Sequence, residues 1–521
     1  MDGTDKARDK AGAAAHPLFS DPPSPDLHRV GVVDVGSNSV RLVVFDGAAR
    51  SPAYFYNEKI MCGLGAGMAA TGRLNREGRA RALKALRRFA ALADAMGIGP
   101  LTGVATAAVR EAEDGPAFRD QVEAETGLSL RIISGAEEAQ LSAQGVLLGR
   151  PTAQGLVCDI GGSSMELAEL AGGRPGRCLT SPLGPLRLDA VPGGKRAQIR
   201  HIDQVMADLR RQLDGAYDTL HLVGGSWRAI ARLDMERRRW PLRVLHEYAF
   251  SPDEARATLD WVEAGDAEAV RGAAGVSSDR MALVPKAAPV LRALLDAFVP
   301  SEIAMSSYGL REGLLYEAMP AVLRDRDPLI EAARFAEATS SRLPGFGKVL
   351  YQFLLPLYAD APHSRLRLIR AACLLHDTAW RAHPDYRAEL CFDNATRANL
   401  GGITHPERVF LGLALMHRYK NLKSGSFDAV ADLVSDADRR DAEILGKAMR
   451  FGAILSVSAP ERMGVLKHHP QAGRVELVLG PAARDLFGEV VMTRFEALAR
   501  AMGCEPEVTL RADPAATATR P

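Results

Sequence analysis

The chain has 521 residues, of which 47% are hydrophobic and 25% are charged, and its formal net charge is +1 at pH 7. This composition is typical of a soluble globular protein, and the length is enough for three or four domains. A net charge so close to zero argues against a global attraction to nucleic acid or membranes, so an anionic ligand would have to be held by local clusters.

The cysteines and the N-terminal segment indicate a cytoplasmic protein. The six cysteines are scattered without a C-x-x-C or zinc-type spacing, which predicts reduced thiols. Residues 1–28 mix charges, alanine and proline without the apolar core of a signal peptide, so we expect a disordered tail. No run of about 18 apolar residues occurs, so no membrane span is expected.

The first predicted element spans residues 30–46 and reads VGVVDVGSNSVRLVVFD. Its two valine-rich runs predict strands that can return as a hairpin, with Asp34 at the end of the first strand. Small residues in a turn let backbone N–H groups crowd around an anion, and hydroxyl groups add further donors. The residues of this candidate phosphate turn are Gly36, Ser37, Asn38 and Ser39.

A helix over 74–96 and a strand over 101–107 are predicted next, and a further helix begins at Ala108. This helix places Arg110 beside the end of the strand, where its guanidinium could fork onto a phosphate. The alternative is a surface arginine on a first helical turn.

The strand predicted over 128–133 leads into the sequence SGAEEAQL, in which Ser134 is a helix N-cap and Glu137 holds the capping-box position. Capping is a complete structural explanation for Glu137. Glu138 points about 100° away from its neighbour on the helix, so it could face a cleft. Spacing alone leaves both solvation and catalysis open for Glu138.

The stretch 155–170, GLVCDIGGSSMELAEL, has the same pattern as the first turn. A short apolar strand ends at Asp159, and Glu166 precedes a run that is compatible with a helix. The turn between them consists of Gly161, Gly162, Ser163 and Ser164. A carboxylate beside an anion-binding turn makes sense mainly if a cation bridges the two, so Asp159 and Glu166 are candidate Mg²⁺ positions, direct or through water. The alternative is an ordinary turn with solvated acids.

Asp34 and Asp159 lie 125 positions apart, and the two strand–acid–turn units around them indicate a duplication. Two such turns that face each other across a cleft could hold a polyphosphate from both sides. Basic stretches at 195–211 and 237–239 could follow such a chain, or they could be solvated faces.

The second half of the chain is predicted to be helical from about 330 to 422, and its amphipathic helix over 365–376 ends in His376-Asp377. A small α+β module follows, with a helix over 441–457, a strand over 475–479, a helix over 487–502 and a strand over 507–510. Residues 512–521 look like a disordered end.

Six strings of this sequence together resemble the exopolyphosphatase/guanosine pentaphosphatase (Ppx/GppA) family. They are DVGSNSVRLVV, TAAVREA, SGAEEAQL, DIGGSSMEL, LVGGSWRAIARL and SSYGLREGLLY, in the family's order over about residues 29 to 318. The resemblance implies the fold of the actin/hexokinase/Hsp70-like superfamily, in which each of two lobes carries a phosphate turn. It also implies release of terminal orthophosphate from inorganic polyphosphate, or of the 5′ γ-phosphate from guanosine pentaphosphate (pppGpp).

The resemblance also implies roles for individual residues. Glu138 matches the family's catalytic base, Arg110 its phosphate-contacting arginine, and Asp159 and Glu166 the acids around the second phosphate turn. The family's common pattern is DIGGGSTE, whereas this chain has Ser163 and Met165 at the departing positions. Neither change removes a carboxylate, so we expect an active site with an altered rate or an altered affinity for phosphate.

The pair His376-Asp377 in helical text resembles the HD phosphohydrolase fold, which binds metals through a histidine, the HD pair and a later aspartate. The upstream segment 332–358 has no histidine, and His363 is expected on the loop just before the helix, too close to replace it. We therefore expect a helical HD-like domain that has lost its metal centre, and the alternative is a live metal site.

The resulting prediction is an α/β protein with two actin-like (ribonuclease H-like) lobes, an all-α HD-like domain and a small α+β C-terminal module. The expected boundaries are 1–28 for the tail, 29–137 and 138–318 for the lobes, 322–425 for the HD-like domain and 426–521 for the module. The expected function is a Mg²⁺-dependent cytoplasmic exopolyphosphatase, a homodimer without nucleic-acid or membrane partners. The alternatives are a pppGpp phosphohydrolase, a sugar kinase or ATPase on the same fold, and a non-catalytic sensor of polyphosphate or pppGpp.

Overall fold

The computed structural model describes residues 29–46, 50–99, 101–265, 271–272, 274–419, 427–483 and 487–511. The chain forms two compact units, one that ends at Pro328 and one that begins at Leu329. The predicted tail 1–28 and the predicted end 512–521 lie outside the described residues. Across the described residues, no helix is long and apolar enough to cross a membrane.

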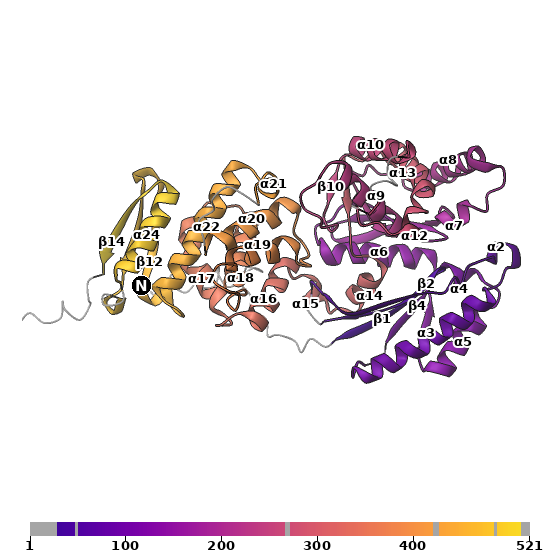
Figure 1. Cartoon of the computed structure of the whole chain (residues 1–521), viewed down its shortest axis with the longest axis horizontal. Coiled ribbons are helices and arrows are strands. Elements are labelled where there is room, and N and C mark those ends of the chain that lie inside the picture. The colour runs from indigo at the N-terminus through magenta and orange to yellow at the C-terminus, as the bar shows by residue number, and fades with distance from the viewer. Residues whose placement is uncertain are drawn as a thin grey trace, which may run out of the picture. The chain divides into compact units, whose positions relative to one another are not determined.

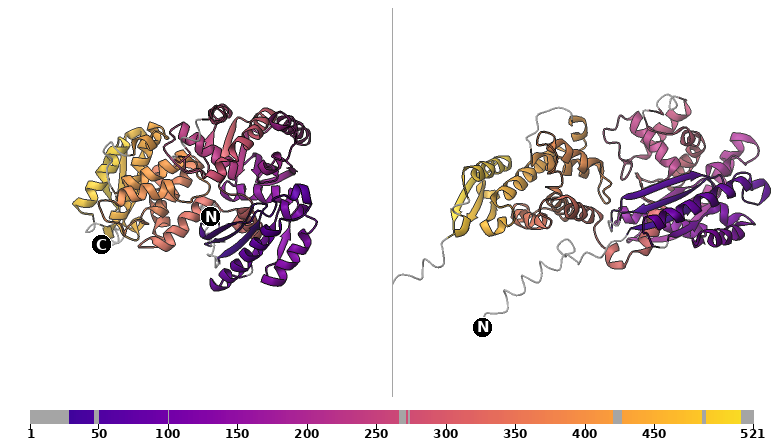
Figure 2. Two further views of the ribbon diagram at one scale, coloured as in Figure 1. Left: turned by 45° about the vertical axis from the view of Figure 1, so that its right-hand side comes forward. Right: turned by 60° about the horizontal axis from the view of Figure 1, so that its bottom comes forward.

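The N-terminal unit contains two sheets with the same strand order (Figure 1). The first sheet has the order β3-β2-β1-β4-β5, and its strands lie side by side in Figure 2. The second has the order β8-β7-β6-β9-β11, extended by β10. In each sheet the first strand of the set pairs antiparallel with the second and parallel with the fourth. This shared topology confirms the expected pair of actin-like folds.

The strands of the first sheet are β1 (Val30–Val35), β2 (Ser39–Phe45), β3 (Tyr54–Met61), β4 (Thr102–Ala105) and β5 (Leu130–Ile132). Those of the second are β6 (Gly155–Ile160), β7 (Met165–Ala171), β8 (Arg174–Ser181), β9 (Thr219–Gly224), β10 (Ala249–Phe250) and β11 (Glu302–Met305).

Helices cover both sheets, and α3 and α5 lie together on the first (Figure 1). Each sheet has its own hydrophobic core. The helices of this unit are α2 (Met68–Thr71), α3 (Arg76–Ala95), α4 (Ala107–Glu111), α5 (Gly115–Thr126), α6 (Gly135–Gly149), α7 (Pro185–Leu188), α8 (Gly194–Gln212), α9 (Gly225–Arg237), α10 (Pro252–Glu263), α12 (Ser278–Met281), α13 (Val284–Phe298), α14 (Leu310–Ala318) and α15 (Ala321–Arg324).

Helices α6 and α14 cross at very short range because glycines leave room for the backbones. A Cβ atom on Gly313 would lie 1.8 Å from the carbonyl oxygen of Leu141, and one on Gly145 would lie 2.2 Å from that of Gly309. Real Cβ atoms do not approach a rigid backbone so closely. The two helices that follow the last parallel strands of each sheet, β5 and β11, are therefore held in direct contact.

The prediction for the run after Glu166 was wrong, because residues 165–171 form strand β7. The sequence MELAELA consists of good helix formers, but β7 lies between β6 and β8 in the sheet, and most of its residues are buried. Burial within a ladder outweighs helix propensities that differ by less than about 1 kcal/mol per residue. The predicted lobe boundary between residues 137 and 138 falls inside α6 and stays a prediction.

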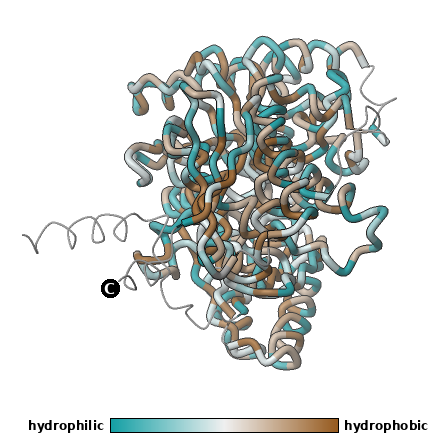
Figure 3. Tube along the Cα trace, turned by 90° about the vertical axis from the view of Figure 1, so that its left-hand side faces the viewer, coloured by the Kyte–Doolittle hydropathy of each residue, from teal (hydrophilic) through white to brown (hydrophobic). Residues whose placement is uncertain are grey.

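The C-terminal unit is a bundle of helices beside a three-stranded sheet, and one hydrophobic core runs through both parts. Hydrophobic residues recur along its helices and strands (Figure 3), and in β13 buried positions alternate with half-buried ones. The sheet has the order β12-β13-β14, with β14 parallel to β13. Strand β12 was missed from the sequence, and His363 begins helix α18, whereas we expected it on the preceding loop.

The elements of this unit are α16 (Pro328–Ser340), α17 (Phe346–Leu354), η1 (Leu355–Tyr358), α18 (His363–Leu375), α19 (Arg387–Arg397), α20 (His405–His417), α21 (Asp428–Ala431), α22 (Asp436–Leu455), α23 (Pro460–Met463), β12 (Gly464–His469), η2 (Pro470–Ala472), β13 (Arg474–Leu479), η3 (Pro481–Ala483), α24 (Glu489–Met502) and β14 (Glu505–Leu510).

Candidate active site

The two predicted phosphate turns are hairpins in the same register, one in each sheet. In the first turn the Gly36 N–H donates to the Ser39 carbonyl at 3.0 Å, and in the second the Gly161 N–H donates to the Ser164 carbonyl at 2.9 Å. Both pairs are related by the 125-residue offset that relates Asp34 to Asp159. The duplication read from the sequence is therefore present in the backbone hydrogen bonds.

The residues opposite the two aspartates differ between the hairpins. Asp34 pairs with Arg41 across β1 and β2, and Asp159 pairs with Glu166 across β6 and β7. Side chains of directly opposed residues project from the same face of an antiparallel pair. Asp159 and Glu166, the two predicted Mg²⁺ positions, therefore share one face.

Neighbouring loops hold both turns in place. The Ser37 carbonyl accepts from the Gly65 N–H at 2.8 Å, and the Asn38 carbonyl accepts from the N–H groups of Cys62 and Gly63 at 2.9 Å. In the second turn the Gly162 carbonyl accepts from the Leu186 N–H at 2.9 Å. Ser163 is packed so closely that a Cβ on Gly184 would lie 2.3 Å from its carbonyl carbon. Gly184 and helix α7, which follow β8, therefore support the second turn.

Glu138 lies in the first turn of α6, and its carboxylate forms an ion pair with Arg110 at 3.0 Å. Arg110 also donates to the carbonyl of Ile133, which fixes the guanidinium beside the carboxylate. The Glu138 side chain is 12% exposed. Burial raises the pKa of Glu138 to about 7, Arg110 opposes the rise, and the charges of Asp159 and Asp34 add to it. A carboxyl group whose pKa lies near 7 can exchange a proton with water at physiological pH.

Glu166 is buried and Asp159 is half-buried, and both have few local partners. The Ser142 hydroxyl donates to Asp159, and the Thr180 hydroxyl donates to Glu166 at 3.0 Å. Burial raises the pKa of Asp159, and burial together with the charge of Glu138 raises that of Glu166. Carboxylates that are desolvated and crowded in this way are stabilised by a cation.

The donor set fits Mg²⁺, a hard cation that prefers carboxylate and phosphate oxygens. Among the described residues, no group of three or more histidine, cysteine or acidic side chains is placed to hold a metal ion by itself. Mg²⁺ in phosphoryl-transfer sites commonly takes only one or two protein carboxylates and completes its shell with water and substrate phosphates. Asp159 and Glu166 can supply that share.

Cationic side chains from distant parts of the unit surround the same acids. Arg311, at the start of α14, lies 3.6 Å from Asp34. Burial, followed by the charge of Arg311, lowers the pKa of Arg41 to about 10 and also lowers that of Arg228. Within the described part of the chain, the Nε atoms of Arg228 and Arg311 are buried without a hydrogen-bond partner. Unpaired buried donors that repel one another favour a bound anion.

Five residues of this site received no role from the sequence. Asp34 was recognised only as the acid before the first turn, although its equivalence to Asp159 was a usable signal. Arg228 follows the small-residue turn after β9, and Arg311 lies in the string SSYGLREG. The remaining two are Arg41 and Lys59, whose pKa is lowered by burial and by Arg280 and Arg41.

The basic stretch 237–239 has structural partners. Arg237 and Arg238 form ion pairs with Asp234, which is fully buried. Their charges are therefore used within the fold, which supports the structural interpretation of this stretch over polyphosphate tracking.

Comparison with known families agrees with this geometry. Residues 43–322 match the model of the Ppx/GppA phosphatase family, and residues 321–508 match the exopolyphosphatase C-terminal domain. The chain belongs to the Ppx/GppA phosphatase family. The family match covers Arg110, Glu138 and the second turn with Asp159 and Glu166, and it begins just after the first turn.

Two relatives and one solved structure extend the comparison. Exopolyphosphatase 1 of Mycobacterium tuberculosis is 28% identical over 320 residues, which cover 58% of this chain and 92% of that protein. Retrograde regulation protein 2 of Saccharomyces cerevisiae is 25% identical over 438 residues, 75% of this chain and 72% of that protein. The structure of an exopolyphosphatase from Cytophaga hutchinsonii, 23% identical, covers 58% of this chain and 99% of its own with a TM-score of 0.50. That likeness concerns the fold.

Proposed function

We propose that this Ppx/GppA family member is an exopolyphosphatase that releases terminal orthophosphate from inorganic polyphosphate. The observation that carries the proposal is the position of Glu138, a buried carboxyl group with a pKa near 7 beside Arg110 and in the field of Asp34 and Asp159. A general base is most effective when its pKa lies near the working pH.

The reaction follows from the charges around Glu138. The carboxylate accepts a proton from water while the water oxygen bonds to the terminal phosphorus and the bridging P–O bond breaks, which yields orthophosphate and a shortened chain. Arg110 and the turn N–H groups that follow Gly36 and Gly161 bind and neutralise the phosphate oxygens, while the N–H groups of these two glycines close the hairpins. Mg²⁺, held through Asp159 and Glu166, would supply further charge neutralisation when bound.

An orthophosphate-release assay tests the proposal with long-chain polyphosphate, with and without Mg²⁺. Glu138→Gln should retain polyphosphate binding and lose turnover, whereas Glu137→Gln should keep both, because Glu137 only caps the helix. Normal phosphate release by Glu138→Gln would refute the assignment of the base.

The same assay separates the alternatives from the proposal. Release from pppGpp but not from polyphosphate would assign the guanosine pentaphosphate activity. Tight polyphosphate binding without release would indicate a sensor, which the unusual Ser163 and Met165 and the regulatory name of the yeast relative make worth testing. A cytoplasmic location and a homodimeric state also stay proposals.

A further inference from the structure

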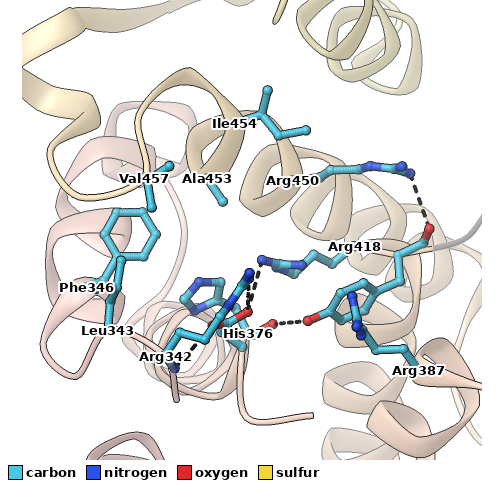
Figure 4. Close-up of a pocket in the computed structure, with 12 residues that line it drawn as sticks. Arg342, Leu343, Phe346, His376, Arg387, Arg418, Arg450, Ala453, Ile454 and Val457 are labelled. Carbon is cyan, nitrogen blue, oxygen red and sulfur yellow. Dashed lines mark hydrogen bonds and ion pairs between the residues drawn. The ribbon is translucent and has the colours of Figure 1, made fainter. Parts of the chain in front are cut away.

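A separate pocket of about 530 Å³ lies in the C-terminal unit, at the end of α18 (Figure 4). Its walls come from the ends of several helices, including α18 with His376 and Asp377, α20 with Arg418, and α22 with Arg450. The volume is in the range of small-molecule sites and is much larger than a single phosphate needs. The pocket contains the predicted HD pair, so the side chains that line it indicate which ligands can bind beside this pair.

The lining has a strong excess of positive charge. Four arginines contribute to it, and Asp377 is the one acidic side chain among the lining residues. His376 adds no charge at neutral pH, since burial and the charge of Arg418 lower its pKa to about 3. A pocket wall with about three uncompensated positive charges favours an anionic ligand.

Two of the arginines bind the Asp377 carboxylate, which a metal ion at the HD pair would need as a ligand. Arg342 binds Asp377 through Nε at 2.7 Å and Nη2 at 2.6 Å, and Arg418 lies 3.7 Å from the same carboxylate. A divalent cation at Asp377 would displace this bidentate pair and would face two guanidinium groups. The surroundings of the HD pair therefore suit an anion better than a metal ion.

Two of the arginines have unused hydrogen-bond donors. Arg418 is 9% exposed, and its Nε atom, like that of Arg387, is buried without a hydrogen-bond partner among the described residues. Both guanidinium groups lie against the ring of Tyr419, Arg418 at 4.5 Å and Arg387 at 5.5 Å from its centroid. Stacking orders these groups before a ligand arrives, which reduces the entropy lost on binding.

The opposite wall of the pocket is apolar. Figure 4 shows Leu343, Phe346 and Val457 on one side and Arg387, Arg418 and Arg450 on the other. Val457 is 69% exposed, so its side chain is accessible to a ligand. Three of the four arginines lie opposite the apolar residues, and Arg342 reaches toward His376 from beside Leu343 (Figure 4). A matching ligand therefore needs an anionic end and an apolar or aromatic body.

We propose that this pocket binds a nucleoside di- or triphosphate, with its phosphates on the arginines and its base against the wall formed by Leu343, Phe346 and Val457. The site is distinct from the candidate active site, since its residues all belong to the C-terminal unit. A flat base fits a wall that contains an aromatic ring, and two or three phosphates match the excess charge.

Isothermal titration of the full-length protein with ATP and with GTP, in EDTA to prevent turnover, tests the proposal. We expect binding that is weakened about tenfold or more by Arg450→Gln and by Arg342→Gln, since each removes a charge-assisted contact. Arg450→Gln should fold normally, because Gln can still donate to the Tyr419 carbonyl, which Arg450 contacts at 3.3 Å, and the change relieves repulsion from Arg494 and Arg418. The matched control is Arg397→Gln, an exposed arginine on α19 outside the pocket, which should bind as the wild type does.

Two further measurements distinguish nucleotide binding in this pocket from nucleotide binding in the candidate active site and from binding of phosphates alone. Arg311→Gln removes a cation of the candidate active site and should leave the nucleotide affinity unchanged. Inorganic triphosphate should bind more weakly than ATP, and Val457→Ser should reduce this difference. The proposal is overturned if neither nucleotide binds, if the two pocket variants bind like the wild type, or if Arg311→Gln alone abolishes binding.

Discussion

Replacing Glu138 by Gln should change two properties in opposite directions: turnover should fall and the folded state should become more stable at alkaline pH. Gln has nearly the same shape and can still accept a hydrogen bond from Arg110, but it does not ionise. Loss of a positioned general base lowers turnover by roughly 10²- to 10⁴-fold. The stability gain follows from the raised pKa of the carboxyl group.

The size of the stability effect comes from linkage. The pKa of Glu138 is raised from 4.5 to about 7 in the folded protein, mainly by burial, so the folded state holds this proton more tightly than the unfolded chain does. The stability that this group contributes is full below pH 4.5 and is lost as the pH rises through about 7. The shift corresponds to about 3 kcal/mol lost by pH 8 in the wild type. Glu138→Gln does not titrate and keeps its stability over this range.

Denaturant unfolding of both proteins at several values between pH 5 and pH 8, in EDTA, measures the effect through tryptophan fluorescence. Three of the four tryptophans, Trp227, Trp240 and Trp261, lie in the N-terminal unit and report on it, and Trp380 reports on the C-terminal unit. The free energy of unfolding of Glu138→Gln relative to wild type should rise by about 2 to 3 kcal/mol from pH 5 to pH 8.

Glu137→Gln is the matched control on the same helical turn. Glu137 has a lowered pKa because the backbone and side chain of Ser134 hydrogen-bond to it, and Gln can replace it as a capping-box acceptor. Its stability relative to wild type should therefore not rise with pH. A pH-independent difference between wild type and Glu138→Gln would refute the argument that Glu138 is a desolvated base, even if turnover fell.

Three further predictions concern the same unit. The kcat/KM for phosphate release should rise with pH and level off above about 7, since the base must be deprotonated, and a flat profile from pH 5.5 to 8.5 would contradict this. Asp159→Asn should raise the Mg²⁺ concentration needed for half-maximal release about tenfold or more, measured by metal titration of turnover. Gly313→Ala should destabilise the protein by about 3 kcal/mol or more in thermal or denaturant unfolding, since its Cβ would lie 1.8 Å from the Leu141 carbonyl, whereas Gly99→Ala meets no atom within 4 Å and should be nearly neutral.

Local signals in the sequence predicted much of the fold. The Ser134–Glu137 capping box formed as expected, because both partners lie within one turn of chain. Strand β13 includes the predicted strand over 475–479, because alternation of apolar and polar residues is also a local feature. Strand β7 was misassigned because the helix formers after Glu166 acquire their strand conformation from β6 and β8, which local periodicity does not reveal.

The candidate site could be predicted only where it repeats a recognisable motif. The turns, Glu138 and Arg110 were named from the sequence, and the structure brings Glu138 into contact with Arg110 and into the electrostatic field of Asp159. Arg311 could not be placed there, since it reaches Asp34 only after the second sheet has folded and α14 has packed on α6. The pairing of Arg342 with Asp377 could not be predicted from the sequence either, because it joins the loop before α17 to the end of α18.

The two matching hairpins carry opposite charges at one equivalent position, Arg41 in the first and Glu166 in the second. The two ends of a linear polyphosphate are chemically identical, so a site with two identical halves would bind the chain equally well in either direction. The difference between Arg41 and Glu166 makes the two hairpins chemically unlike. Under the proposed function, the phosphates therefore meet a cation beside the first turn and a carboxylate beside the second, so the two halves of the site act differently on the substrate.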